Sequence, residues 1–437
     1  MAMDYQQTVE YLFNSTPVFE KIGVGAYKEG LSTTLALDEH LGHPHRHFTT
    51  IHVAGTNGKG SVSHTIAAIL QKSDARVGLF TSPHLVDFRE RIRVNGQCIS
   101  EEYVVDFVDR HRQFFEPLHP SFFELTTAMA FDYFAHEQVD IAVIEVGLGG
   151  RLDCTNIITP ILSIITNISL DHTQLLGNTE AAIAAEKAGI IKPGVPVVVG
   201  EANEATRPVF EQKAHEAGAP LIFATDHPIV ERTDEGPGHS LMYFTRPYGY
   251  IHGELGGDYQ VSNTNTILAA IGLLREQGVP ITHDAIKMGF ADVCQSTGLM
   301  GRWQQLGEHP TVICDTGHNV GAWRILAPQL KAQQCRQLRI VFGMVDDKDI
   351  HTVMAMLPAD ATYYFTKASS KRAISETDVR QIGEKLGLAG QAYPTVGQAY
   401  EAAMAEADEA DLIFVGGSSY VVADFLAHLR NTGGNAE

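Results

Sequence analysis

The stretch His52-Val-Ala-Gly-Thr-Asn-Gly-Lys-Gly-Ser61 decides the fold class of this chain. The apolar residues 50–54 predict a β-strand, and the periodic pattern of residues 61–72 predicts a helix after the glycine-rich turn. Small residues let backbone N–H groups converge on phosphate oxygens, and a helix N-terminus adds partial positive charge. We therefore expect a phosphate-binding loop that contains Asn57, Gly58, Lys59, Gly60 and Ser61.

Two side chains of this loop suit a nucleoside triphosphate. Lys59 can neutralise the β- and γ-phosphates of ATP, and the hydroxyl of Ser61 can face Mg²⁺. The spacing departs from the standard GxxxxGK(S/T) loop, because Val53 stands where the first glycine belongs and Gly60 separates Lys59 from Ser61. The alternative interpretation is an ordinary tight turn between a strand and a helix.

Beyond this loop, apolar runs alternate with helical patterns along most of the chain. Further strands are predicted at residues 75–80, 139–146, 161–166 and 195–199. Such alternation is typical of an α/β fold with a mainly parallel sheet and helices on both faces. We expect two doubly wound domains: an N-terminal P-loop ATPase-like domain over residues 1–296 and a smaller, Rossmann-like C-terminal domain over residues 297–437.

Two irregular segments interrupt the alternation. Residues 224–257 are rich in Gly, Pro, Tyr and charged residues, and they predict a β-rich excursion within the N-terminal domain. Residues 294–301 are small, polar and aperiodic, so they predict the linker between the domains. After the linker, strands are predicted again at residues 311–314, 339–342, 362–365 and 412–415.

Composition limits the classes of partner. The chain has 437 residues, with 32 Lys and Arg against 52 Asp and Glu, and its net charge of −20 argues against nucleic acid or an anionic membrane as a partner. The five cysteines are scattered and form no CxxC pair, which favours reduced thiols in a cytoplasmic protein. We expect no secretory signal at residues 1–13 and no segment that spans a bilayer.

Several further motifs follow the predicted strands in order. They are Thr81-Ser-Pro-His-Leu85, Glu90-Arg-Ile-Arg93, the run from Glu145 to Asp153, Asp171-His172, the run from Glu186 to Gly189, Gly301-Arg302 and the run from Asp315 to Asn319. With the phosphate loop, this combination resembles the folylpolyglutamate synthase and dihydrofolate synthase family of the Mur-ligase superfamily, of the bifunctional bacterial type. The resemblance spans nearly the whole chain.

A metal site is predicted at the carboxyl ends of the strands, where open α/β sheets bind ligands. Ser82 and Glu145 are hard oxygen ligands that suit Mg²⁺, and a charge at the end of the apolar strand 139–146 is costly unless it is paired or metal-bound. His172 is a softer ligand, and the resemblance implies a second metal position there. The alternatives are a salt bridge from Glu145 to Arg151 or another local cation, and a structural, hydrogen-bonded His172.

The resemblance implies further roles in catalysis and ATP binding. It implies that Lys187 is a carbamate that supports the metal site, whereas composition alone favours a solvated charge pair with Glu186. It groups His318 with Lys59 and Lys187 as catalytic. The second domain is expected to deliver groups to ATP, and the resemblance implies that Asn263, Arg302 and Asp315 contact the nucleotide. The alternatives are an interdomain salt bridge for Arg302 and a helix cap for Asp315.

The resemblance implies that three segments recognise a pterin substrate. The first lies around residues 30–33, and the other two contain the residues named below. The rings of Phe122 and Phe123 can stack on a flat heterocycle, and carboxylates can accept from its N–H groups. The predicted substrate residues are Phe122, Phe123, Glu124, Leu152, Asp153 and Cys154. The alternative is that the two phenylalanines belong to the core.

The resemblance therefore implies an ATP-dependent ligase that joins L-glutamate to the carboxylate of dihydropteroate, of a folate, or of both, through an acyl phosphate. ATP and Mg²⁺ are the implied cofactors, with two metal positions, and a monomer is expected. Departures from the family include Tyr259, which stands where a His often precedes Gln. The alternatives are a Mur-type ligase acting on a cell-wall precursor and a nucleotide-binding regulatory module without ligase activity.

Overall fold

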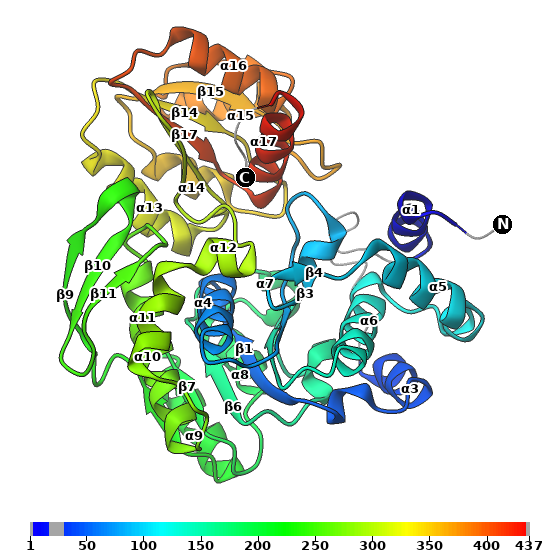
Figure 1. The fold of residues 1–437 in the computed structure, drawn as a ribbon. Coiled ribbons are helices and arrows are strands. Elements are labelled where there is room, and N and C mark those ends of the chain that lie inside the picture. The colour runs from blue at the N-terminus through cyan, green and yellow to red at the C-terminus, as the bar shows by residue number, and fades with distance from the viewer. Residues whose placement is uncertain (1–2, 17–29, 434–437) are drawn as a thin grey trace. The chain divides into compact units, whose positions relative to one another are not determined.

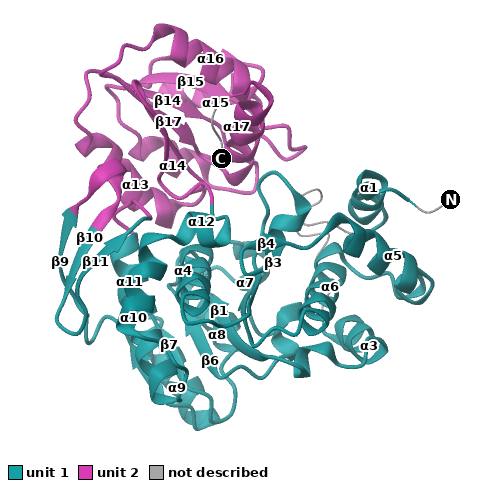
Figure 2. Ribbon diagram, in the orientation of Figure 1, with its two compact units in different colours: residues 1–234, 242–254, 260–299 teal, residues 235–241, 255–259, 300–437 magenta. Residues whose placement is uncertain are grey.

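The chain folds into two compact units, seen in a computed structural model that describes residues 3–16 and 30–433. Unit 1 comprises residues 1–234, 242–254 and 260–299, and unit 2 comprises residues 235–241, 255–259 and 300–437 (Figure 2). The last crossing between the units falls between Leu299 and Met300. Before this crossing, the chain enters unit 2 twice, at the short segments 235–241 and 255–259.

Unit 1 contains an eight-stranded sheet with the order β4-β3-β2-β5-β1-β6-β7-β8 (Figure 1). Its strands are β1 Thr49–Ala54, β2 Val77–Phe80, β3 Ile92–Val94, β4 Gln97–Cys98, β5 Ile141–Glu145, β6 Leu162–Ile165, β7 Val197–Val199 and β8 Leu221–Phe223. Neighbours from β2 to β8 are parallel, whereas β3 and β4 add an antiparallel hairpin at one edge. The prediction of a mainly parallel sheet is confirmed.

Helices cover both faces of this sheet. The described helices of unit 1, some of which pack on other helices, are α1 Tyr5–Ser15, α3 Ser32–His40, α4 Lys59–Gln71, α5 Glu101–Phe115, α6 Phe122–His136, α7 Thr173–Leu176, α8 Glu180–Ala188, α9 Arg207–Ala217, α10 Gln260–Glu276, α11 His283–Ala291 and α12 Val293–Thr297, with short 3-10 turns η2 Pro44–Arg46, η3 Phe88–Arg91, η4 Glu116–Leu118 and η5 Cys154–Ile157. Helix α4 packs on β1, β2 and β5, and α10 packs on β6 and β7. Side chains alternate along a strand, so each strand also faces the side of the sheet opposite α4 and α10. On that side, Ile144 of β5 shares a core with α6, and Ala54 of β1 shares a core with α8.

The β-rich excursion is a three-stranded sheet of β9 Val230–Glu235, β10 Leu241–Thr245 and β11 Gly249–Gly253. The predicted linker at residues 294–301 is wrong in part, because α12 occupies residues 293–297. Tertiary contacts stabilise this short helix: Val293 and Thr297 are buried, and Thr297 Oγ1 lies 2.8 Å from His64 Nδ1 of α4. Its composition alone carried no helical signal.

Unit 2 is a six-stranded sheet with the order β12-β13-β17-β14-β15-β16 and helices on both faces. Its elements are η6 Pro237–His239, β12 Gln304–Glu308, β13 Thr311–Asp315, α13 Val320–Ala332, β14 Leu338–Phe342, α14 Ile350–Met356, β15 Thr362–Thr366, α15 Glu376–Lys385, β16 Gly390–Tyr393, α16 Val396–Glu406, β17 Leu412–Gly416 and α17 Ser419–Asn431. Among these described strands, only β12 is antiparallel to its neighbour. Helices α13, α14 and α15 share one core with the sheet, and α16 and α17 pack on the opposite face.

Each helix from α13 to α17 begins after a polar side chain that caps it. The capping residues are Asn319, Asp349, Ser375, Thr395 and Ser418. Such caps satisfy backbone N–H groups that a helix leaves without an internal partner. Within the described residues, no helix combines the length and the apolarity that a bilayer crossing requires.

Candidate active site

The glycine-rich loop between β1 and α4 is held by the segment that follows β6. Backbone N–H groups of Thr56 and Asn57 donate to Asn167, to its carbonyl oxygen at 2.9 Å and its Oδ1 at 3.0 Å. The hydroxyl of Thr166 donates to the carbonyl of Asn57. The loop conformation therefore depends on the neighbouring strand end as well as on its own residues.

Glycine is required at two positions of this loop. Gly58 has φ +83°, and a Cβ there would lie 2.3 Å from Asn263 Oδ1. Gly55 has φ +149°, and a Cβ there would lie 1.8 Å from Thr166 Oγ1. A side chain at either position meets both backbone strain and a clash, because L-residues rarely adopt positive φ.

Lys59 begins α4 and turns its ammonium back over the loop. Its Nζ donates to the carbonyls of Gly55 and Thr56, at 3.2 Å each. The N-cap residue is Gly58, which has no side chain with which to cap the helix. The loop thus combines an uncapped helix start with a cation, the arrangement that binds phosphate.

Three polar side chains connect α10 with the phosphate loop inside unit 1. Gln260 Nε2 donates to Ser61 Oγ at 3.2 Å, and Asn263 Nδ2 donates to Gln260 Oε1 at 2.8 Å. Asn263 belongs to unit 1, within the residues 1–296 predicted for the N-terminal domain, so only two of the predicted ATP contacts, Arg302 and Asp315, belong to unit 2. Sequence reasoning missed Gln260, although its spacing of three from Asn263 places both on one helix face.

Glu145 and Ser82 meet at the carboxyl ends of β5 and β2. Glu145 is the last residue of β5 and is only 3% exposed, and its Oε2 accepts from the backbone N–H of Ser82 at 3.1 Å. The register pairs Glu145 with Val53, so the carboxylate belongs to the strand beside the phosphate loop. A buried carboxylate next to a residue that carries a hydroxyl offers the hard oxygen donors that suit a cation such as Mg²⁺.

His172 follows β6, on the other side of β1, and is the N-cap residue of α7. Its backbone N–H donates to Asp171 Oδ1 at 2.8 Å, and its Nε2 lies 3.9 Å from the same oxygen. The described part of the chain holds no group of three or more His, Cys, Asp or Glu side chains placed to bind a metal. A cation here would take few protein ligands, a set that suits Mg²⁺, which keeps waters and phosphate oxygens.

Lys187 is buried near the same strand ends. Lys187 is only 5% exposed. A Cβ added at Gly150 would lie 3.0 Å from the Cα of Lys187, so the glycine-rich loop after β5 packs directly on the end of α8. Burial and then the charge of Lys59 lower the pKa of Lys187 to about 7, against the opposing effects of Asp171 and Asp153.

The simpler interpretation of Lys187 does not fit the structure. Glu186 pairs with Arg151 at 2.9 Å, whereas Lys187 is buried, so the solvated pair of Glu186 and Lys187 is wrong. The guanidinium of Arg151 is more than half exposed in that pair. Arg151 therefore joins the loop after β5 to α8.

The carboxylates of the predicted pterin segments already have local donors. Asp153 accepts from the backbone of Leu148 at 2.9 Å and from that of Thr155 at 3.0 Å, and burial raises its pKa. Glu124 accepts from the backbone of Ser121 at 2.7 Å and from the hydroxyl of Thr34 at 3.3 Å. Both carboxylates stabilise the turns that carry them.

The other predicted substrate residues differ in exposure. Phe122 is 2% exposed, stacks on Phe13 at 4.6 Å between ring centroids and lies under the guanidinium of Arg91, so its packing accounts for the ring without a ligand. Phe123 lies against the loop after β5, because a Cβ at Gly147 would be 2.4 Å from its Cζ. Leu152 and Cys154 are partly exposed, and burial raises the pKa of the Cys154 thiol.

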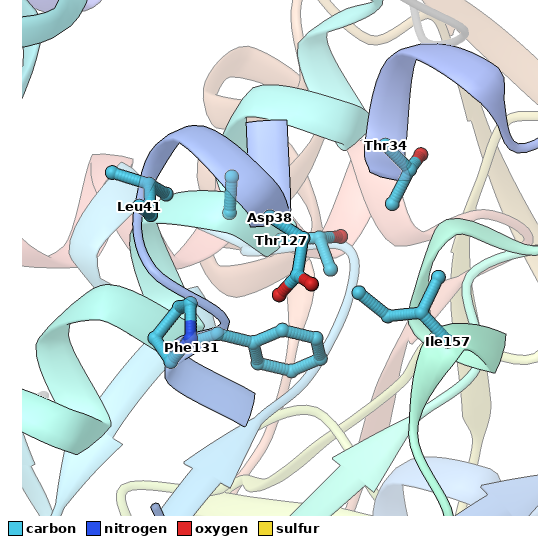
Figure 3. Close-up of a pocket in the computed structure, with 8 residues that line it drawn as sticks. Thr34, Asp38, Leu41, Thr127, Phe131 and Ile157 are labelled. Carbon is cyan, nitrogen blue, oxygen red and sulfur yellow. The ribbon is translucent and has the colours of Figure 1, made fainter. Parts of the chain in front are cut away.

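A small pocket adjoins these segments in unit 1 (Figure 3). Its lining residues are Thr34, Asp38, Leu41, Pro44, Thr127, Ala128, Phe131 and Ile157. Thr34 also bonds to Glu124, which places the pocket beside the predicted pterin segments. Asp38 is held by His43 at 2.7 Å and His45 at 2.6 Å.

In unit 2, Asp315 ends β13 and is 3% exposed. Its Oδ2 accepts from the backbone N–H of Trp303 at 2.8 Å, and its Oδ1 accepts from that of Gly317 at 2.7 Å. Burial raises the pKa of Asp315, while the Arg302 guanidinium acts in the opposite direction. Asn319, rather than Asp315, caps α13, so the helix-cap interpretation of Asp315 is wrong.

Arg302 and His318 belong to the same region of unit 2. Arg302 Nη1 donates to the carbonyl of Gly301 at 3.3 Å. His318 Nδ1 lies 3.1 Å from the carbonyl oxygen of Thr316. The side-chain hydroxyl of Thr316 donates to the carbonyl of Gly301. The segment before β12 and the turn after β13 are therefore joined around the carbonyl of Gly301.

The phosphate loop and the Asp315 turn fall into two recognised domain families. Residues 53–274 match the Mur ligase middle domain, and residues 301–419 match the Mur ligase glutamate ligase domain. The two domain matches define the chain as an ATP-dependent ligase built from Mur ligase domains.

Full-length relatives define the family more closely. The chain is 33% identical over 423 residues to the dihydrofolate synthase/folylpolyglutamate synthase of Bacillus subtilis, covering 94% of this chain and 96% of that protein. It belongs to the folylpolyglutamate synthase/dihydrofolate synthase family, as the motifs predicted. It spans about half, 50%, of a probable bifunctional folylpolyglutamate synthase/dihydropteroate synthase of Haloferax volcanii that it also matches.

Solved structures agree with this membership. Escherichia coli FolC in complex with DHPP and ADP has a TM-score of 0.83 and 31% identity, with 99% of each chain covered. The bifunctional folylpolyglutamate synthase/dihydrofolate synthase of Yersinia pestis complexed with AMPPNP and Mn ion has a TM-score of 0.81 and 31% identity, with 98% of each chain covered. Both likenesses extend over the two units of this chain.

Proposed function

We propose that this chain joins the amino group of L-glutamate to the carboxylate of dihydropteroate, or of the glutamate tail of a tetrahydrofolate, through an acyl phosphate. The γ-phosphoryl group of ATP passes to a carboxylate oxygen, and ADP leaves. The glutamate amine then attacks the acyl carbon, an amide bond forms and inorganic phosphate is released. The observation that carries the proposal is the uncapped phosphate loop with Lys59 beside the Ser82–Glu145 pair.

The nucleotide and metal assignments rest on the chemistry of the donor sets. We assign the phosphates to Asn57, Gly58, Lys59, Gly60 and Ser61, and further ATP contacts to Asn263, Arg302 and Asp315. We assign Mg²⁺ to Ser82 and Glu145, with a second position at His172. The metal supplies charge neutralisation at the phosphates, and the chain's own residues orient the phosphates and exclude water around them.

Lys187 is proposed to act as a carbamate. A pKa of about 7 leaves a large share of neutral amine at physiological pH, and only the neutral amine captures CO₂. The carbamate would place a negative charge beside Lys59. The unmodified ammonium of Lys187 would instead repel the ammonium of Lys59. His318 is proposed as the remaining catalytic residue, on its place in the Asp315 turn.

The pterin is assigned to Phe123, Glu124, Leu152, Asp153 and Cys154, with Phe122 packed beneath them. We further propose a cytoplasmic monomer, supported by five cysteines that are free thiols. We propose that the N-terminal functional domain ends at residue 296 and that the C-terminal one begins at residue 297. The segments 235–241 and 255–259, which belong to unit 2, are assigned to the C-terminal domain.

The test is phosphate release from ATP with L-glutamate, with and without Mg²⁺. Dihydropteroate, tetrahydrofolate and a cell-wall precursor are offered separately. Release that needs dihydropteroate or tetrahydrofolate supports the proposal and shows which acceptor is used. Release that needs only the cell-wall precursor identifies the Mur-type alternative, and no acceptor-dependent release identifies a nucleotide-binding module.

A further inference from the structure

The hydroxyl of Tyr259 donates a hydrogen bond to Oδ2 of Asp315, with the two oxygens 2.6 Å apart. The two residues are 56 positions apart in sequence, and both belong to unit 2. The ring of Tyr259 packs against the core that includes Trp303 and Phe414, which fixes the position of the hydroxyl. Nothing in the proposed function gives Tyr259 a role.

The carboxylate of Asp315 is nearly saturated by its neighbours. An ionised carboxylate has about four acceptor positions. Among the described residues, Oδ2 accepts from the hydroxyl of Tyr259 and the backbone of Trp303, and Oδ1 accepts from the backbone of Gly317. Three positions are therefore filled, and the one that remains is on Oδ1.

We propose that Tyr259 is a positioning residue for nucleotide binding, whose hydroxyl holds the carboxylate of Asp315 so that Oδ1 keeps one free acceptor position for a ribose hydroxyl. The inference rests on the proposed function, because that function assigns Asp315 to ATP. The two backbone donors alone constrain the carboxylate less, since each of its oxygens then accepts only one hydrogen bond. The third donor fixes the rotation of the group before the nucleotide arrives, which lowers the cost of binding.

A tyrosine suits this task because its hydroxyl remains a donor. Burial and the neighbouring Asp315 raise the pKa of Tyr259 well above its usual value, so the hydroxyl keeps its proton at physiological pH. The charge of Arg302 opposes the effect of burial on Asp315 and favours the ionised acceptor. The 2.6 Å separation of the two oxygens is the length of a charge-assisted O–H···O⁻ bond, which is stronger than a neutral pair.

The test compares Tyr259→Phe with wild type, using ATP and 2′,3′-dideoxy-ATP. Steady-state kinetics give kcat and KM, and titration calorimetry gives the nucleotide Kd. We expect wild type to prefer ATP, and Tyr259→Phe to raise both KM and Kd for ATP about tenfold with little change in kcat. With the dideoxy nucleotide, which has no ribose hydroxyls, the variant and wild type should be equal.

Tyr364→Phe is the matched control. The hydroxyl of Tyr364 also donates to a carboxylate at 2.6 Å, that of Glu406, and it also lies in unit 2. A general loss of stability would affect both variants, whereas the ATP effect should appear only in Tyr259→Phe.

The outcomes separate this inference from the function on which it rests. Wild type that binds no ATP would overturn the proposed function. Wild type that binds ATP and the dideoxy nucleotide equally, a Tyr259→Phe variant that behaves like Tyr364→Phe, or an equal penalty with both nucleotides would each overturn the role of Tyr259 while leaving the ligase activity standing.

Discussion

Two strand-to-helix turns, residues 55–59 between β1 and α4 and residues 315–319 between β13 and α13, both follow the carboxyl end of a parallel strand. The first begins its helix after Gly58, without a capping side chain, and folds a lysine over its own carbonyls. The second begins its helix after Asn319, whose side chain caps it, and surrounds a carboxylate with donors. One turn therefore offers positive charge and open N–H groups, and the other offers an acceptor.

The two turns also differ in the charge of the residue beside them. At the first turn, the charge of Lys59 lowers the pKa of the buried, unmodified Lys187, because two like charges lie near each other. At the second turn, Arg302 and Asp315 are opposite charges, and Arg302 favours the ionised carboxylate. A phosphate site can therefore hold unbalanced positive charge until an anion is present, either the carbamate proposed for Lys187 or the phosphates, whereas a site for neutral hydroxyls is balanced beforehand.

Replacing Lys59 by Ala should produce the largest effect. Phosphate release should fall about 1000-fold, because the ammonium is the charge placed at the phosphates. The fold should remain intact, since the side chain lies on the loop and outside the core. Circular dichroism and the thermal midpoint provide the control, and near wild-type phosphate release would remove the loop from the active site.

Replacing Lys187 by Ala should lower activity about 100-fold, as for other residues that support a metal site. Short carboxylic acids should restore part of the activity, because a small anion can replace the carbamate. Wild-type enzyme should also lose activity after acidic, CO₂-free dialysis and regain it with bicarbonate. An active Lys187→Ala enzyme, or unmodified lysine in active protein by intact mass, would contradict the carbamate.

The same lysine predicts a pH dependence of stability in CO₂-free buffer. Its pKa is about 7 in the folded chain against 10.5 for a solvated lysine, so the unfolded chain binds more protons between these values. Stability should therefore rise with pH, by about 1.4 kcal/mol per unit relative to Lys187→Met. Denaturant unfolding at pH 7, 8 and 9 measures the difference, and parallel curves for the two proteins would show that the lysine is not buried as described.

Replacing Gly58 by Ala should lower activity about tenfold, because the left-handed backbone alone costs about 1–2 kcal/mol for an L-residue. The new Cβ would also lie 2.3 Å from Asn263 Oδ1. Gly249→Ala is the control: it has φ +68° and nothing within 4 Å of the added Cβ. Both variants should lose stability, but only Gly58→Ala should raise the KM for ATP, and equal KM values would mean that the loop tolerates a side chain.

Replacing Asn319 by Ala should have the smallest effect. The side chain accepts from the backbone N–H of Ala322 at 2.9 Å, and loss of such a cap costs about 1 kcal/mol. Thermal unfolding measures the loss, and Ser375→Ala, which removes the cap of α15, should cost a similar amount. An Asn319→Ala protein as stable as wild type would show that α13 does not depend on its cap, and would weaken the contrast with α4.

Much of the fold could be predicted because it is written in short-range patterns. The strand before the phosphate loop, the glycines of the loop and the helix after it lie within about twenty consecutive residues, and their periodicity and turn chemistry depend only on neighbours. The alternation of strands and helices similarly predicts the parallel sheets. Helix α12 was missed because its residues become helical through packing on α4, a contact that no local pattern records.

The sequence by itself determined the α/β class, the phosphate loop and the order of motifs that identifies the family, because each depends on residues close together in the chain. Only the tertiary structure decided that Gln260 bonds Ser61 from 199 positions away and that Tyr259 bonds Asp315 from 56 positions away. It also decided that Lys187 is buried while Glu186 beside it pairs with Arg151. Burial and long-range hydrogen bonds follow from how whole elements pack, so identical local sequence is compatible with either a solvated lysine or a buried one.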